Sequence, residues 1–177
     1  MRLPKFISED DWDLIVEKSL QYRVNPALPI AIGWHETNWG RLGWGKLGYH
    51  LGVGCFNEKE ADERFKGLEN QLDWACGRIS EFLPFRPTLD ELKRFCGKVW
   101  KPANCNSWSK SVYGIYENLI KNYFPEFLIY DAPPSYAVQP LFEFYKKGYL
   151  NFPWGTNTFY RLIVVLSNVL RKKDERR

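Results

Sequence analysis

The segment from Asn25 to Gly40 limits the fold more than any other part of the chain. Asn25 and Pro26 are typical of a helix start, because an asparagine side chain caps the first turn and a proline fits the first helical position. The residues that follow are apolar on nearly every side of a helix: Ala27, Leu28, Ile30, Ala31, Ile32 and Trp34. A helix that is apolar all round is buried, and Gly40 is its natural end. We therefore expect a buried helix here.

Capping signals and apolar residues at helical spacing predict four further helices in the first 131 residues. The first is expected over about residues 9–22, after the cap Ser8, and the second from Leu68 to Phe82, before Pro84. A short third helix follows the capping box of Thr88 and Glu91. The fourth follows the cap Ser107 and has one apolar face, formed by Trp108, Val112, Ile115 and Leu119. Residues 41–66 are rich in glycine, which predicts an irregular loop with short strands. The fold class is therefore mainly α.

Two adjacent prolines in Ala132-Pro133-Pro134-Ser135 mark the expected domain boundary, since neither proline can continue a helix. Residues 1–131 would then form the main domain, and residues 136–177 a helical appendage with helices from about Pro140 to Lys147 and from Thr158 to Leu170. The second of these has an apolar stripe made of Phe159, Leu162, Ile163, Leu166 and Leu170. Because the stripe needs an apolar partner, we expect the appendage to pack on the main domain.

Charge and composition exclude several classes of protein. The net charge is +4, and the positive charges are spread through the chain except for a basic tail from Arg171 to Arg177. We interpret this tail as a solvated terminus in preference to a contact with nucleic acid or a membrane. No basic stripe supports a helical nucleic-acid-binding protein, and the last predicted helix is too short to span a bilayer. We expect a monomer with no integral membrane segment, whose basic surface suits an anionic polymer such as a bacterial wall.

Cysteine and histidine usage argues against a metal site. Four cysteines occur without a CxxC pair, beside only two histidines, so zinc is disfavoured and no cofactor is expected. One or two disulfides and buried free thiols both remain open. The N-terminus lacks the apolar run of a signal peptide, so we expect a chain that is synthesised in the cytoplasm and, if exported, leaves by another route.

Glu36 lies near the end of the predicted buried helix, where the surroundings suit an acid catalyst. Its helical neighbours Ile32 and Trp39 are apolar. Apolar surroundings and the negative end of a helix dipole both favour the protonated carboxyl, which is the form that a general acid needs. The alternative is a glutamate that only hydrogen-bonds the following loop. The adjacent His35 points elsewhere and is expected to be packed or hydrogen-bonded, whereas Gly33 would let a neighbouring helix approach.

Residues 31–40, Ala-Ile-Gly-Trp-His-Glu-Thr-Asn-Trp-Gly, followed by Gly-Tyr-His-Leu-Gly-Val-Gly at residues 48–54, resemble the signature of the glucosaminidase-type peptidoglycan hydrolases and lytic transglycosylases of the lysozyme-like superfamily. In that family an apolar helix precedes Glu-Ser-x-Trp-Gly, and Thr37 stands here where serine is usual. Weaker likeness at residues 65–71 and 106–113 extends the resemblance over about residues 25–120. It implies a lysozyme-like α+β domain with a small β-hairpin and loop region beside a cleft.

The resemblance implies cleavage of the β-1,4 bonds between N-acetylglucosamine and N-acetylmuramic acid in peptidoglycan, with Glu36 as general acid. Trp39 matches the family's structural tryptophan. Hydrolysis usually needs a second carboxylate, for which the loop offers Glu58, Glu60, Asp62 and Glu63; we take Glu58 and Glu63 as the catalytic candidates. A solvated acidic loop is the alternative. Glu36 alone could then run a lytic transglycosylase reaction, in which a hydroxyl of the substrate displaces the leaving group.

Aromatic residues make up 17% of the chain and include 8 tryptophans, which either fill the core or stack on sugar rings. The predicted substrate-binding residues are Trp39, Trp44, Tyr49, Trp108 and Tyr113. The family's tyrosine before its last helix has no clear counterpart, because the nearest aromatics, Trp100 and Trp108, lack a phenol. A phage endolysin or virion-associated enzyme fits these expectations, and the competing class is a non-catalytic wall-binding or phage structural module on the same fold.

Overall fold

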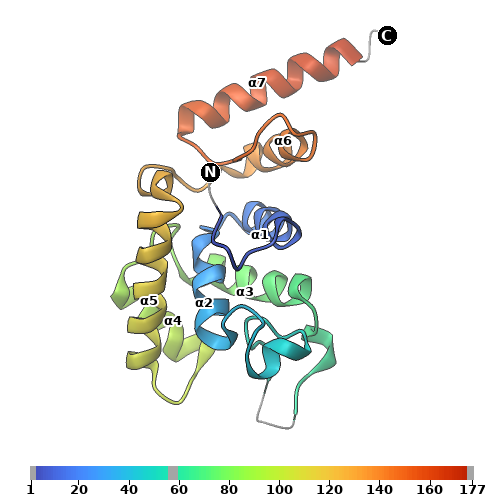
Figure 1. Cartoon of the computed structure of the whole chain (residues 1–177). Helices are drawn as coiled ribbons and strands as arrows, with labels where there is room; N and C mark the ends of the chain where they lie inside the picture. The colour runs from blue at the N-terminus through green and yellow to red at the C-terminus, as the bar shows by residue number, and fades with distance from the viewer. Residues whose placement is uncertain (1–2, 56–59, 175–177) are drawn as a thin grey trace.

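The buried helix predicted from the sequence is α2 (Ala27–Thr37), which lies at the centre of the computed structural model (Figure 1). The structure describes residues 3–55 and 60–174. Every residue from Ala27 to Gly33 is buried, and α2 packs against α5 and α3. Asn25 is also buried, and its side chain accepts a hydrogen bond from the Ala27 N–H at 3.0 Å. The asparagine cap thus starts the helix as expected.

Six further α-helices surround α2 in the described part of the chain. They are α1 (Glu9–Tyr22), α3 (Leu68–Phe82), α4 (Leu89–Phe95), α5 (Cys105–Asn122), α6 (Ser135–Lys146) and α7 (Asn157–Asp174), with short 3-10 turns η1 (Gly43–Leu47), η2 (Glu63–Phe65) and η4 (Pro125–Leu128) and a π-helical turn η3 (Cys96–Trp100). The prediction of a mainly α protein is therefore confirmed. No helix within the described ranges is long and apolar enough to cross a membrane.

The expected strands of the glycine-rich region do not form in its described part. Residues 41–55 and 60–66 contain η1, η2 and one isolated antiparallel bridge between Cys55 and Ala61. The physical reason is backbone geometry, since glycines at positive φ turn the chain repeatedly: Gly40, Gly43, Gly48, Gly52 and Gly54. An alternating strand cannot persist through such turns.

Two helix starts differ from the prediction. Helix α5 is capped by Asn104, whose side chain accepts from the Ser107 N–H at 3.0 Å, so Ser107 lies inside the first turn and is not the cap. Helix α6 begins at Ser135, one turn before the expected Pro140. Pro140 is tolerated within the helix because the carbonyl that lacks its N–H partner belongs to Tyr136, which is exposed to solvent.

The C-terminal segment packs on the remainder through α6 and the loop that follows it. The Tyr145 hydroxyl donates to Asp13 on α1 at 2.5 Å, and Trp154 is buried against Trp12 and Phe127. Helix α7, however, lies on α6 and leaves most of its apolar stripe uncovered, including Leu162, Leu166 and Leu170. The expected stripe is therefore divided: Ile163 is buried and Phe159 is half-buried, whereas the three leucines remain exposed, because α7 packs on α6 and not on the main domain.

Candidate active site

The Glu36 carboxyl lies where α2, the η3 turn and α5 meet. Two indole N–H groups donate to its Oε1 atom: Trp108 Nε1 at 2.6 Å and Trp100 Nε1 at 2.9 Å. Both distances are within the range of charge-assisted hydrogen bonds or close to it. Since an indole nitrogen is a donor only, Oε1 must act as an acceptor from both. A proton carried by this carboxyl therefore sits on Oε2.

Gly52 borders the second oxygen of Glu36. Its backbone is left-handed with φ of +70°, and a Cβ placed on it would lie 3.4 Å from Glu36 Oε2. Because glycine has no Cβ, no side chain of residue 52 covers this oxygen. The geometry thus gives the two oxygens different surroundings, with Oε1 held by two donors and Oε2 facing the backbone of Gly52.

Buried Gln71 on α3 holds this loop in place. The backbone N–H groups of Leu51 and Val53 donate to its Oε1 at 3.1 and 3.0 Å, and its Nε2 donates to the carbonyls of Val53 and Phe65 at 2.7 and 2.6 Å. The side chain amide therefore uses all its donor hydrogens and both acceptor positions. Because Gly52 lies between two of the bonded residues, Gln71 fixes the position of Gly52 relative to Glu36.

A cavity of about 420 Å³ opens beside Glu36. Its wall is formed by the loop at Gly52 and by aromatic side chains from three other elements, and the lining residues are Gly52, Val53, Gly54, Cys55, Phe65, Trp74, Val99, Trp100 and Lys101. Trp74 packs edge-on against both Phe65 and Trp100, with ring centroids 6.3 and 5.5 Å apart. Trp100 thus belongs to the cavity wall and also hydrogen-bonds Glu36, so the carboxyl lies next to two residues of the wall, Trp100 and Gly52.

The end of α2 is fixed by contacts that the sequence predicted only in part. The helix stops at Thr37, and Asn38, Trp39 and Gly40 all adopt positive φ. A bulky residue rarely adopts such a conformation, and Trp39 is held in it by its indole, which donates to Asp11 on α1 at 2.9 Å. The Trp39 ring also covers Gly33, where a Cβ would come within 2.8 Å of it. Gly33 therefore accommodates this ring, not a neighbouring helix.

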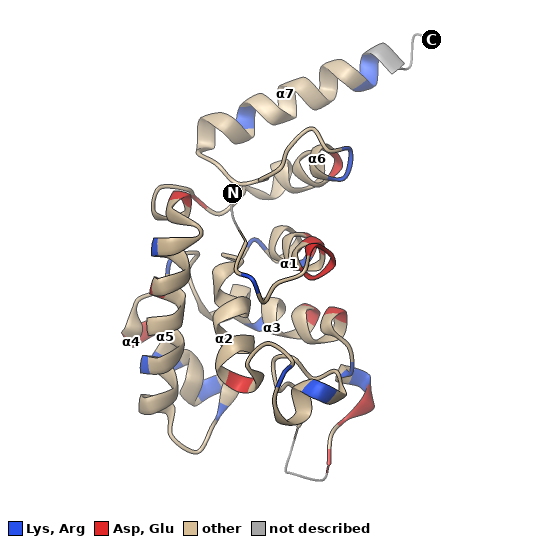
Figure 2. Ribbon diagram, in the orientation of Figure 1, with Lys and Arg blue, Asp and Glu red and all other residues tan. Residues whose placement is uncertain are grey.

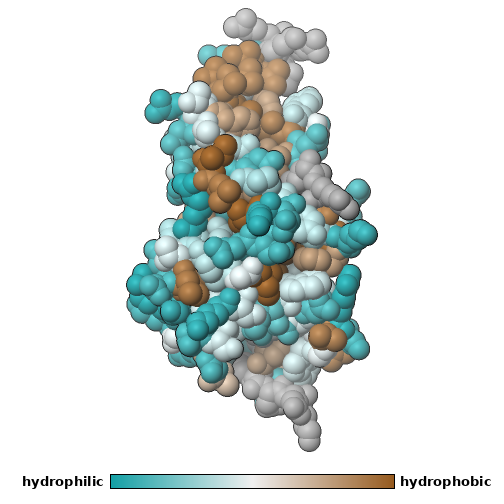
Figure 3. Space-filling model, turned by 60° about the vertical axis from the view of Figure 1, so that its left-hand side comes forward, coloured by the Kyte–Doolittle hydropathy of each residue, from teal (hydrophilic) through white to brown (hydrophobic). Residues whose placement is uncertain are grey.

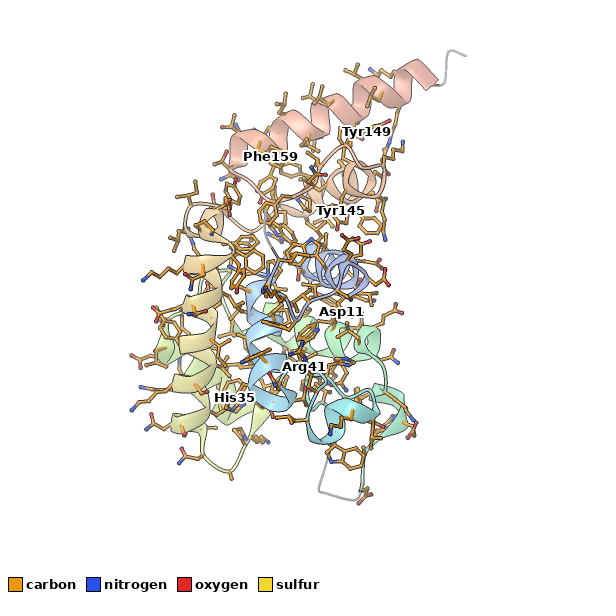
Figure 4. All side chains as sticks on the ribbon, in the orientation of Figure 1. Asp11, His35, Arg41, Tyr145, Tyr149 and Phe159 are labelled. Atoms are coloured by element: carbon orange, nitrogen blue, oxygen red, sulfur yellow. The ribbon has the colours of Figure 1, made fainter. Side chains whose placement is uncertain are left out.

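The hydroxyl of Thr37 joins the helix end to the glycine-rich loop. Thr37 is buried, its Oγ1 accepts from the Gly40 N–H at 2.9 Å, and it contacts the carbonyl of His50. A serine hydroxyl could make the same bonds. Next to Glu36, His35 lies between α2 and α5 (Figure 4), where its Nδ1 is 2.9 Å from Ser111 Oγ. The prediction of a hydrogen-bonded histidine is confirmed.

Of the predicted sugar-stacking residues, Trp108 is the one that contacts Glu36, but it is buried and serves as a hydrogen-bond donor. Trp39 and Tyr49 are buried as well, and the Tyr49 hydroxyl donates to Glu63 at 3.4 Å. Half-buried Trp44 packs edge-on against Tyr49. Tyr113 lines a different cavity on the outer side of α5. A buried ring cannot stack on a sugar, so three of the five are core residues.

The predicted partner carboxylates are distributed as follows. Glu58 lies outside the described residues. Glu63 is exposed and forms a salt bridge with Lys66 at 3.1 Å in addition to its bond with Tyr49. Asp62 caps η2 and pairs with Arg64, whose hydrogen bonds hold the pKa of the Asp62 carboxyl below its usual range. The described contacts of Glu63 and Asp62 are therefore those that stabilise the loop.

All four cysteines are free thiols. Cys55 lines the cavity, and burial together with the negative charge of Glu36 raises the pKa of its thiol to about 11. Burial likewise raises the pKa values of Cys76 and Cys96 to about 12. The question that the sequence left open, disulfides or free thiols, is settled in favour of thiols in this structure.

Several residues of the site could not be selected from the sequence alone. Trp100 and Trp74 carry no local signal beyond being aromatic. Gln71 is a polar residue on an otherwise apolar helix face, which is the one sequence feature that indicates a buried amide hydrogen-bonded to the loop. Each acts through partners far away in sequence.

No protein-family model, curated protein sequence or solved structure matches this chain. What the site does must therefore be inferred from its own chemistry.

Proposed function

We propose that the protein is a glycosidase that cleaves β-1,4 bonds in the glycan strands of peptidoglycan, with Glu36 as general acid. The observation that carries the proposal is the asymmetry of the Glu36 carboxyl: Oε1 accepts two indole N–H bonds, and Oε2 faces Gly52 beside a cavity lined by aromatic rings. A general acid needs a proton on an oxygen that a substrate can reach, and Oε2 meets that need.

The two indoles also suit the proton transfer itself. When Glu36 gives its proton to a glycosidic oxygen, negative charge develops on the carboxylate. Preorganised donors aimed at a developing charge stabilise the transition state more than the ground state. Trp100 and Trp108 are held in place by ring contacts with Phe95 and with each other, so they need not reorganise as the charge appears.

The cavity dimensions and lining suit a sugar ring. Its volume of about 420 Å³ is within the range of small-ligand sites. The Trp74 and Trp100 rings supply apolar surface, and Lys101 adds a positive charge at the cavity, which favours the acidic lactyl group of N-acetylmuramic acid. The resemblance of residues 31–40 to the peptidoglycan-cleaving family agrees with this choice of substrate.

The test is the substitution Glu36→Gln, assayed on purified bacterial cell walls. The amide oxygen still accepts both indole bonds, but the amide has no acidic proton to donate, so lytic activity should fall about 100-fold or more without loss of the fold. Glu81→Gln is the matched control, because Glu81 is an exposed glutamate that pairs with Arg78 on the surface of α3. Glu36→Gln activity within a few-fold of wild type would contradict the proposal.

Mass spectrometry of the released fragments then identifies the reaction. A reducing N-acetylglucosamine end indicates a glucosaminidase, a reducing N-acetylmuramic acid end a muramidase, and an anhydro end a lytic transglycosylase. If the walls are bound but never cut, by wild type and Glu36→Gln alike, the alternative of a wall-binding module is supported instead.

A further inference from the structure

Helix α7 presents an apolar stripe to solvent along its outer side. Five side chains form this exposed stripe, of which the three leucines also belong to the stripe predicted from the sequence. They are between 41% and 57% exposed: Leu162, Val165, Leu166, Val169 and Leu170. Their spacing of three and four residues places them on one side of the helix. The opposite side packs on α6, where Tyr160, Ile163 and Ser167 are buried. Figure 3 shows apolar side chains gathered at the end of the molecule that α7 forms.

Positive charge borders this stripe. Arg161 and Lys172 are both exposed and lie three helical turns apart, so they fall on the same edge of the helix, next to Val165. The charged residues that Figure 2 shows on the described part of α7 are nearly all basic, and the chain has no acidic residue from Asn157 to Lys173. Arg171 is bound to Glu143 of α6 at 2.8 Å. The outer side of α7 is therefore apolar and cationic.

A second copy of the chain is a poor occupant for this surface. Two such helices would bring cationic edges together with no acidic residue between Asn157 and Lys173 to pair with them. The stripe also extends over nine residues, which is about 12 Å of helix, whereas a stable coiled coil needs three or four heptads. An anionic surface with an apolar interior satisfies both features of the stripe, since the charges meet opposite charges and the aliphatic side chains leave water.

We infer that α7 docks the protein on the surface of a bilayer that contains anionic phospholipids, with the helix lying in the plane of the headgroups. In the sequence, the basic residues of the C-terminal tail follow the apolar stripe directly. Helix α7 and the C-terminal end of α2 lie at opposite ends of the molecule (Figure 1). Docking through α7 therefore leaves the Glu36 cavity turned away from the bilayer and accessible.

The experiment measures co-flotation of the full chain with vesicles of phosphatidylglycerol mixed with phosphatidylcholine, and with vesicles of phosphatidylcholine alone. Binding is expected for the anionic vesicles, and it should weaken as salt is added. The double variant Leu166→Glu with Val169→Glu should lower the partition coefficient at least about tenfold, because two aliphatic side chains no longer leave water. Arg161→Gln with Lys172→Gln should lower it about fivefold for each cation removed.

The matched control is Leu42→Glu with Leu47→Glu, which changes two equally exposed leucines beside η1 in the same way. This control should bind as wild type does, and circular dichroism should show the same melting temperature for all variants. Absence of binding to anionic vesicles at low salt, equal binding to neutral vesicles, or an equal loss in the control would overturn the inference. So would a concentration-dependent doubling of mass in sedimentation that the α7 variant abolishes, since that result assigns the stripe to a second copy. None of these readouts depends on lytic activity.

Discussion

Trp108 Nε1 donates to Glu36 Oε1 at 2.6 Å, so a residue near the start of α5 holds a carboxyl at the end of α2. The two residues are 72 positions apart in sequence. The indole of Trp100 donates to the same oxygen at 2.9 Å, so two tryptophans from different elements hold one carboxylate oxygen.

Trp108→Phe tests the donor role of this indole. Phenylalanine keeps an aromatic ring but removes the N–H, and hydrogen bonds to charged groups contribute about 1.5–3 kcal/mol. We expect kcat on cell walls to fall about tenfold or more while the substrate affinity changes little. Trp154→Phe is the matched control, because the Trp154 indole is buried and its N–H has no hydrogen-bond partner among the residues that the structure describes. A tenfold loss in both variants would show that ring volume, not the hydrogen bond, matters.

Gly52→Ala tests whether the space beside Oε2 is needed. The added Cβ would sit 3.4 Å from Glu36 Oε2, the oxygen that we propose donates the proton. Gly148 has the same φ of +70° but open space around it, so Gly148→Ala carries the same backbone strain without touching the site. Each variant should lose about 1 kcal/mol of stability, which lowers the melting temperature by about 2–4 °C. Only Gly52→Ala should lose activity, and unchanged activity in it would refute the role of Oε2.

Local signals predicted the helical part of this fold well. The capping box of Thr88 and Glu91, the start of α1 after Ser8 and the burial of α2 depend on neighbours within four residues, and all are confirmed. Errors arose where the outcome depends on tertiary structure. Ser107 and Asn104 are both good caps, and the choice of Asn104 depends on the path of the preceding η3 turn, which no local pattern specifies.

The candidate site was harder to predict from the sequence, because its residues come from segments that are far apart in the chain. Glu36 could be singled out by its apolar neighbours on one helix. Trp100, Gly52 and Gln71 contribute to the site through tertiary contacts. Tyr49 is of a residue type that can stack on sugar rings, yet it is buried. Aromatic residues fill cores and line binding sites by the same physical chemistry. Burial, which depends on the whole fold, is what separates the two uses.

Gln71→Leu tests the amide that fixes the loop at Gly52. Leucine has a similar volume but leaves two backbone N–H groups and two carbonyls without their partner, and an unsatisfied buried group costs about 1–3 kcal/mol. We expect about 3 kcal/mol or more of lost stability, seen as a melting temperature lower by roughly 6–12 °C. Asn70→Leu, on the exposed side of the same helix, should change it by less than about 2 °C. Similar losses in both variants would argue against this role of Gln71.

The alkylation rate of Cys55 provides a test that depends on pH. The reactive species is the thiolate, and burial and the charge of Glu36 raise the pKa of this thiol to about 11. At pH 8, iodoacetamide should therefore modify Cys55 on the order of 100-fold more slowly than an ordinary cysteine, whose pKa is about 8.5. The rate should rise about tenfold for each pH unit until it levels off near pH 11.

A Cys105→Ser background isolates this signal, because Cys76 and Cys96 are fully buried. Removing the neighbouring charge with Glu36→Gln should lower the pKa of Cys55 and speed the reaction at pH 8, whereas Glu81→Gln should not. The raised pKa also means that Cys55 contributes stability that is present below about pH 8.5 and is lost as the pH rises through about 11. If chitooligosaccharides occupy the cavity, they should protect Cys55 from modification. Alkylation at the rate of a free thiol, unaffected by Glu36→Gln, would show that the thiol does not face the acid.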